Sequence, residues 1–202
     1  LKRLFEHATT FGSLIQVPEG LAKKLPALQQ LSEATSQDLF VSAALKRLGP
    51  LVQQAELLAA QYDAVVANPP YMGLKKMNPI LKRYASTAYK ASKGDLYAMF
   101  MARGFGLGTP GGCLSMVTMH AWMFLPTFEA FRKDILRHKT VLSLAHLGPR
   151  AFAQISGEVV QTAAFVLRKS ALGNVRPVFL RLVDGDEADK SLALRSGMCR
   201  CT

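Results

Sequence analysis

The chain has 202 residues, half of them hydrophobic, which is enough for one domain with a hydrophobic core and excludes a disordered tail. Its apolar runs fall short of the roughly eighteen residues that span a bilayer, and its three cysteines include no C-x-x-C pair. We therefore expect a cytoplasmic protein with no membrane contact, no disulfide framework and no metal. The net charge of +11 favours a polyanionic partner.

Residues 1–60 are predicted to be a helical segment. Apolar residues recur at helical spacing over 21–31 and again over 39–57, and Ser36 with Asp38 could cap the second helix. The pair Gly49-Pro50 is expected to kink or interrupt that helix, because proline has no backbone N–H to donate.

Residues 61–170 are predicted to be the C-terminal half of an α/β domain with a mostly parallel sheet. Tyr62 to Ala67 is a valine-rich apolar run that stops at Asn68, the profile of a strand buried on both faces. We expect a basic loop with helical turns over 72–94, helices over 95–104 and 126–138, a turn over 109–112, and strands over 113–119, 141–147 and 159–167. Residues 171–202 are expected to be irregular or the start of a following region.

Positive charge gathers soon after the first predicted strand. Residues 72–104 hold seven basic side chains and one acidic one, whereas residues 1–60 hold six and five. A solvated helix face is the usual explanation of such a run, but its position beside the strand end favours nucleic acid. The candidates for phosphate contacts are Lys75, Lys76, Lys82 and Arg83.

The tetrapeptide Asn68-Pro69-Pro70-Tyr71 carries the chemistry, because ligands of open α/β sheets bind at the carboxyl ends of strands. An exocyclic amine is a poor nucleophile while its lone pair is delocalised into the ring. The Asn68 side-chain oxygen and the Pro69 carbonyl could accept its two N–H groups and stabilise the charge that develops as it attacks a methyl group. Pro69 and Pro70 stiffen the loop, and Tyr71 offers a face on which an extruded base stacks.

A tetrapeptide of this kind after a valine-rich strand resembles the signature of the amino-methyltransferases, and its surroundings resemble the gamma-type N6-adenine DNA methyltransferases. Three later blocks match that family in its order, namely 94–100, 109–112 and 151–162. Residues 11–15 and the end of the last block are particularly similar to the PglX-type methyltransferases of BREX phage-defence systems.

The resemblance implies a class I (Rossmann-like) methyltransferase fold, of which this chain holds the C-terminal half of the sheet preceded by the helical segment. It implies transfer of a methyl group from S-adenosylmethionine to N6 of a flipped adenine in double-stranded DNA, in a phage-defence or restriction-modification setting. Other defence-system proteins are candidate partners. Asp95 and Phe100 would contact the cofactor, and Phe152 would contact the flipped base together with Tyr71.

The chain also departs from the family pattern. The Gly-rich cofactor loop and the acidic ribose-binding residue are absent from residues 1–60, so we expect the main cofactor loop outside this chain and an inactive isolated fragment. Gly104, Gly106 and Gly108 do not replace that loop, because they follow a helix and precede a strand, the reverse of the order that a dinucleotide loop needs.

Two other functions remain compatible with the sequence. A protein glutamine methyltransferase uses a similar tetrapeptide, because an amide nitrogen poses the same chemical problem, and a DNA-binding scaffold could keep the basic stretch without catalysis. The basic stretch and Phe152 favour DNA, and the intact tetrapeptide favours an enzyme. Phe100 and Phe152 are also compatible with core packing, as are His120 and Trp122, which follow a strand end.

Overall fold

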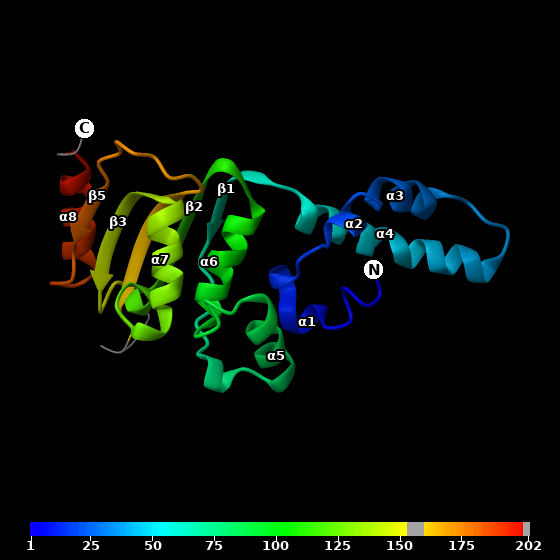
Figure 1. Cartoon of the computed structure of the whole chain (residues 1–202), viewed down its shortest axis with the longest axis horizontal. Helices are drawn as coiled ribbons and strands as arrows, with labels where there is room; N and C mark the ends of the chain where they lie inside the picture. Colours follow the sequence, from blue (N-terminus) through cyan, green and yellow to red (C-terminus); the bar gives the residue numbers. More distant parts are fainter. Residues whose placement is uncertain (153–159, 200–202) are drawn as a thin grey trace. The chain divides into compact units, whose positions relative to one another are not determined.

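The computed structural model describes residues 1–152 and 160–199 (Figure 1). The chain divides into two compact units, Leu1–Gln61 (the N-terminal unit) and Tyr62–Thr202 (the sheet unit). Part of the last block that resembles the methyltransferases, residues 153–159, lies outside the described residues. No helix in the described ranges is both long and apolar enough to cross a membrane.

The N-terminal unit is helical. Asp38 caps its longest helix by accepting two backbone N–H groups, and that helix runs through Pro50, so the chain is not interrupted at Gly49-Pro50. Leu25 and Val52 are buried where two of the helices pack together. The helices are α1 (Ala8–Phe11), α2 (Glu19–Ala22), α3 (Leu25–Glu33) and α4 (Leu39–Ala59), with a 3-10 turn η1 (Gly12–Leu14).

The sheet unit holds a five-stranded sheet with the strand order β1-β2-β4-β3-β5. Its strands are β1 (Tyr62–Ala67), β2 (Gly108–Met119), β3 (Thr140–Gly148), β4 (Thr162–Arg168) and β5 (Val178–Arg181). β1, β2, β3 and β5 run in one direction, and β4 runs against both of its neighbours. Four of the five strands thus share one direction, as the prediction of a mostly parallel sheet requires. The prediction missed that β4 is antiparallel to both of its neighbours.

Helices α6 (Leu96–Leu107) and α7 (Glu129–His138) cover one face of this sheet (Figure 1). Met101 of α6 and Ile135 of α7 join Leu114 and Phe165 of the strands in one buried cluster. Each such side chain contributes about 1.5–3 kcal/mol on burial. α6 approaches β2 closely at Gly104, where a Cβ would lie 2.5 Å from a Leu114 methyl carbon. This glycine therefore serves packing rather than phosphate binding.

Two predicted loop regions differ in the structure. The stretch predicted as a basic loop with helical turns contains a 3-10 turn, η2 (Leu74–Lys76), and a ten-residue helix, α5 (Pro79–Ala88). The predicted turn over 109–112 lies inside β2 as a bulge: Tyr62 pairs with Gly108, but Ala64 already pairs with Cys113. Extra residues on one strand produce this shift in register.

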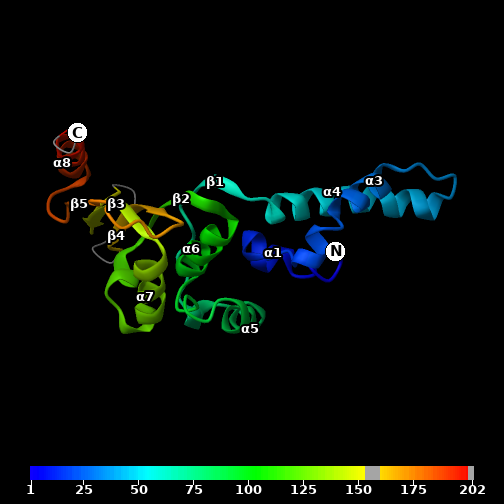
Figure 2. The same cartoon turned by 45° about the horizontal axis from the view of Figure 1, so that its top comes forward.

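Residues 171–202, predicted to be irregular or the start of a following region, hold two regular elements. β5 pairs in parallel with β3 and extends the sheet. The helix α8 (Glu187–Cys199) follows it and lies on the side of the sheet opposite α7 (Figure 2). The described part of the unit is completed by two short 3-10 turns after β2, η3 (His120–Met123) and η4 (Pro126–Phe128).

Candidate active site at the carboxyl edge of the sheet

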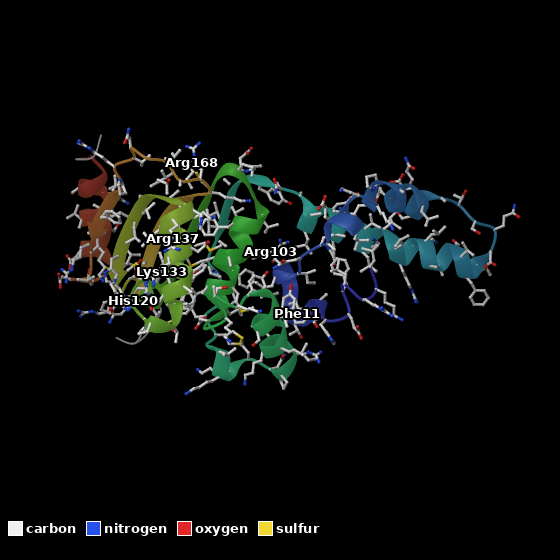
Figure 3. The ribbon with its side chains drawn as sticks, in the orientation of Figure 1. Phe11, Arg103, His120, Lys133, Arg137 and Arg168 are labelled. Atoms are coloured by element: carbon white, nitrogen blue, oxygen red, sulfur yellow. The ribbon has the colours of Figure 1, made fainter. Side chains whose placement is uncertain are left out.

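Three strands of the same direction end at one edge of the sheet. β1 ends at Ala67, β2 at Met119 and β3 at Gly148. Figure 3 shows His120, which follows β2, at this carboxyl edge, and Arg168, which ends the antiparallel β4, at the opposite one. The tetrapeptide leaves from the end of β1, so it lies where ligands of open α/β sheets bind.

The tetrapeptide alternates in exposure. Asn68 and Pro70 are exposed, whereas Pro69 is buried. The loop is therefore anchored at Pro69, while the Asn68 side chain stays accessible to a substrate. The two prolines have fixed φ angles, and each restricts the residue before it, so the loop is stiff without further contacts.

Tyr71 is half-buried and connects the tetrapeptide to β2 and α6. Its hydroxyl donates to the Val117 carbonyl at 3.5 Å, and its ring meets that of Tyr97 edge-on with 5.9 Å between centroids. Burial, followed by the negative charge of Asp95, raises the pKa of Tyr71. The phenol is therefore neutral at physiological pH and acts as a hydrogen-bond donor.

Asp95 fastens the segment after the tetrapeptide to the start of α6. Its Oδ1 accepts the N–H of Met72 at 2.9 Å and that of Tyr97 at 3.3 Å, so it is also the N-cap of α6. The backbone N–H of Leu96 donates to the Met72 carbonyl at 3.0 Å and closes the connection. Burial raises the pKa of Asp95, and the N–H donors oppose that change. Its contact with a cofactor stays a prediction.

A pocket of about 600 Å³ opens beside this fastened segment. It brings together four of the predicted side chains, Tyr71, Lys75, Lys76 and Asp95. Phe100 packs at the margin of the core cluster, and the α6 aromatic that lines the pocket is Tyr97, together with Phe128 of η4. Sequence reasoning missed Tyr97. This residue lies two positions after the N-cap Asp95, in the first turn of α6, which is the turn nearest the tetrapeptide.

The four predicted phosphate contacts lie on two successive elements. Lys75 and Lys76 are exposed on η2 and line the pocket. Lys82 is half-buried and Arg83 is exposed on α5. α5 begins at a well-formed cap, where the Asn78 side chain accepts the Leu81 N–H at 2.8 Å. The structure thus presents cations both at the pocket and beyond it.

Phe152 follows the end of β3 by four positions and is 37% exposed. A large apolar side chain so accessible at the carboxyl edge suits contact with a base, but it is not among the residues that line the pocket. Within the described ranges, no group of three or more His, Cys, Asp and Glu side chains could hold a metal ion.

His120 and His146 form a hydrogen-bonded pair at the same edge. Nδ1 of His120 lies 2.8 Å from Nε2 of His146, and the Phe124 ring packs against both. Burial lowers the pKa of both imidazoles; the neighbouring His146 lowers that of His120 further, as Arg181 and Lys190 do for His146. At neutral pH both rings are therefore uncharged, and the N–H of one ring donates a hydrogen bond to the bare nitrogen of the other.

This pair makes stability depend on pH. Because both folded-state pKa values lie below the unfolded value of about 6.5, the unfolded chain gains protons first as the pH falls, and the folded state loses stability. We expect the His120→Gln, His146→Gln double variant to melt below the wild type at pH 8 and to approach it at pH 5. Thermal denaturation followed by circular dichroism measures the gap. A gap that did not change with pH would contradict the argument.

The fold and the site together define a class of protein. An α/β half-sheet with Asn-Pro-Pro-Tyr at the carboxyl end of a strand, beside a pocket lined by aromatic side chains, Asp95 and two lysines, is the arrangement expected of a methylase. The chain belongs to the Eco57I restriction-modification methylase family, whose model matches residues 18–152.

Relatives support the finer resemblance. The chain is 49% identical over 197 residues to the adenine-specific methyltransferase BrxX of Escherichia coli O9:H4 (strain HS), covering 96% of this chain and 16% of BrxX. It is 44% identical over 140 residues to the adenine-specific methyltransferase PglX of Lacticaseibacillus casei (strain Zhang), covering 69% of this chain and 12% of PglX. The predicted similarity to PglX-type enzymes is thus confirmed.

The fold also matches a solved structure. A chain of the solved DrdV–DNA complex aligns with this protein with a TM-score of 0.53 and 18% identity. The alignment covers 76% of this protein's chain and 18% of the matched chain in the complex. The expected α/β fold is confirmed, and the chain spans only a small part of the length of each of these proteins.

Proposed function

We propose that the protein to which this chain belongs transfers a methyl group from S-adenosylmethionine to N6 of an adenine flipped out of double-stranded DNA, in a phage-defence or restriction-modification setting. The observation that carries the proposal is the accessible Asn68 at the carboxyl end of β1, on a loop held by Pro69 and Asp95 beside a pocket of about 600 Å³. The names of BrxX and PglX, both adenine-specific methyltransferases, support it.

The chain's own part in the reaction is to bind and orient the amine. Asn68 Oδ1 and the Pro69 carbonyl each accept one N–H of the adenine amine, which turns its lone pair towards the methyl carbon. As the new N–C bond forms and the bond between the methyl group and the cofactor's sulfur breaks, with the sulfur left as a neutral thioether, these oxygens would stabilise the positive charge on N6, and water would then take the surplus proton. Tyr71 and Phe152 would hold the base by their aromatic faces, and Tyr71 remains neutral while doing so.

The pocket suits a nucleoside-containing cofactor. S-adenosylmethionine supplies an activated methyl group when it is bound. Aromatic walls at Tyr97 and Phe128 provide apolar contact for its adenine. Asp95 uses one carboxylate oxygen for the backbone and could offer the other to a cofactor N–H. Phe100 would support this wall from the core cluster.

The test uses the full-length protein with S-adenosylmethionine, plasmid DNA and, in a parallel reaction, a glutamine-containing peptide substrate. Mass spectrometry should find N6-methyladenine in the digested DNA and no methylated peptide. Methylglutamine without methyladenine would favour a protein glutamine methyltransferase. Neither product, with cofactor and DNA binding confirmed, would favour a DNA-binding scaffold.

We propose that Lys75 and Lys76, with Lys82 and Arg83, bind DNA phosphates. Removing one basic side chain that contacts a phosphate should reduce the magnitude of the slope of log affinity against log salt concentration by about 0.9. The Lys75→Ala, Lys76→Ala double variant should therefore show a slope smaller by about 2, with similarly weakened binding to specific and unrelated duplexes. Fluorescence anisotropy over a salt series measures both.

A matched control removes the same charge elsewhere. Lys46 and Arg47 are adjacent and exposed on α4 of the N-terminal unit. Their double alanine variant should keep the wild-type salt slope. Equal slopes in the two double variants would mean that Lys75 and Lys76 are solvated charges.

Other defence-system proteins also remain proposed partners, on the resemblance to PglX-type enzymes.

A further inference from the structure

A buried lysine holds the chain at the end of β3. Lys190 of α8 is 4% exposed, and its ammonium donates to the carbonyls of Leu147 at 2.5 Å, of Pro149, and of Val183 at 3.4 Å. An ammonium group has three donors and no acceptor, so three carbonyls satisfy it completely. Burial of such a cation is costly unless these partners are in place, so the side chain and the carbonyls hold one another in position.

The start of α8 determines where this ammonium lies. The Asp189 N–H donates to Asp186 Oδ1 at 3.0 Å, and the Asp186 N–H donates to Asp189 Oδ2 at 3.2 Å. This reciprocal arrangement is a capping box, which fixes the first turn of a helix. Gly185, at φ +79°, brings the chain tightly into that turn, against the Asp189 side chain. Lys190 is the next residue, so its direction is set by the cap.

The segment that Lys190 holds is constrained at its other residues too. Gly148 has φ +64°, and a Cβ there would lie 2.9 Å from Val183 Cα. The Thr162 hydroxyl donates to the Gly148 carbonyl at 3.2 Å. Arg150 has φ +56°, a conformation that residues other than glycine rarely adopt. Such conformations persist where neighbouring contacts enforce them, and they gather at functional sites.

We propose that Lys190 is a positioning residue for the base contact made by Phe152. By holding the Leu147 and Pro149 carbonyls, its ammonium sets the path of the chain up to three residues before Phe152, and thereby the place of that exposed ring at the carboxyl edge. The inference rests on the proposed function, because it takes the flipped adenine as the partner of Phe152. Lys190 acts through this segment, since its ammonium is engaged by the three backbone carbonyls.

The test compares Lys190→Met with Lys169→Met in the full-length protein. Methionine keeps the length of the side chain but lacks the donors. Lys169 is the matched control, because its ammonium also donates to a backbone carbonyl, that of Gly108 at 2.7 Å, at the opposite edge of the sheet. The probe is a duplex with 2-aminopurine in place of the adenine that the wild type methylates, which becomes fluorescent when it is unstacked.

Lys190→Met should lose most of the 2-aminopurine signal and about 10-fold or more in single-turnover methylation rate, as a small misplacement near the reacting atoms does. Its cofactor affinity should stay at the wild-type value. Lys169→Met should melt earlier but flip and methylate normally. Lys190→Arg, which restores donors, should recover the signal. If Lys190→Met does not fold, Lys190→Gln should show the same loss in smaller measure.

The outcomes separate the two proposals. A wild type that methylates DNA, with a Lys190→Met variant that flips and methylates as Lys169→Met does, would overturn the positioning role alone. A wild type that leaves DNA unmethylated would overturn the proposed function and this inference with it.

Discussion

Replacing Asn68 by alanine should lower the rate of methyl transfer by roughly 10³-fold, the usual cost of removing one group that stabilises developing charge. The variant loses one of the two acceptors that hold the amine, and Pro69 alone cannot orient its lone pair. Asn68 is exposed at the end of β1, so its removal should leave the fold, the cofactor affinity and the DNA affinity nearly unchanged. Single-turnover methylation of DNA by the full-length protein measures the rate.

The chain offers a matched asparagine. Asn78 caps α5 through the Leu81 N–H, so Asn78→Ala should cost about 1 kcal/mol of stability without removing a substrate contact. It should methylate at close to the wild-type rate, although it melts earlier. Asn68→Ala retaining more than about a tenth of the wild-type rate would argue that the amine is activated elsewhere.

The central part of the site was predictable because its signals are local. A valine-rich run that ends at Asn68-Pro69 predicts a strand followed by a stiff loop, and β1 is that strand, although it is largely exposed and not buried on both faces as predicted. The helix predicted over 95–104 was predictable for the same reason, since its apolar residues recur at helical spacing, whereas the capping role of Asp95 is seen only in the structure. These two features already bring the tetrapeptide to the edge of a sheet.

The features that were missed depend on contacts between distant parts of the chain. The antiparallel direction of β4 follows from its insertion between β2 and β3, which no local pattern of residues 162–168 reveals. β5 is only four residues long and gains its place by pairing with β3. The choice of Tyr97 rather than Phe100 as a pocket wall depends on the position of Tyr71, beyond the reach of spacing along α6.

The end of β3 approaches Val183 closely at Gly148. Gly148→Ala should destabilise the sheet unit by about 3 kcal/mol, since alanine at φ +64° costs about 1–2 kcal/mol and a Cβ 2.9 Å from Val183 Cα adds the cost of overpacking against backbone. The midpoint of thermal unfolding should fall by roughly 6–12 °C for a unit of this size.

Gly173→Ala is the control for this variant, because that glycine is exposed and a Cβ there would meet nothing within 4 Å. Its midpoint should stay close to that of the wild type, within about 0.5 kcal/mol. Equal midpoints for the two variants would mean that β3 can move away from Val183 at little cost. In that case the carbonyls that Lys190 holds would not be firmly placed, since Gly148 lies between them.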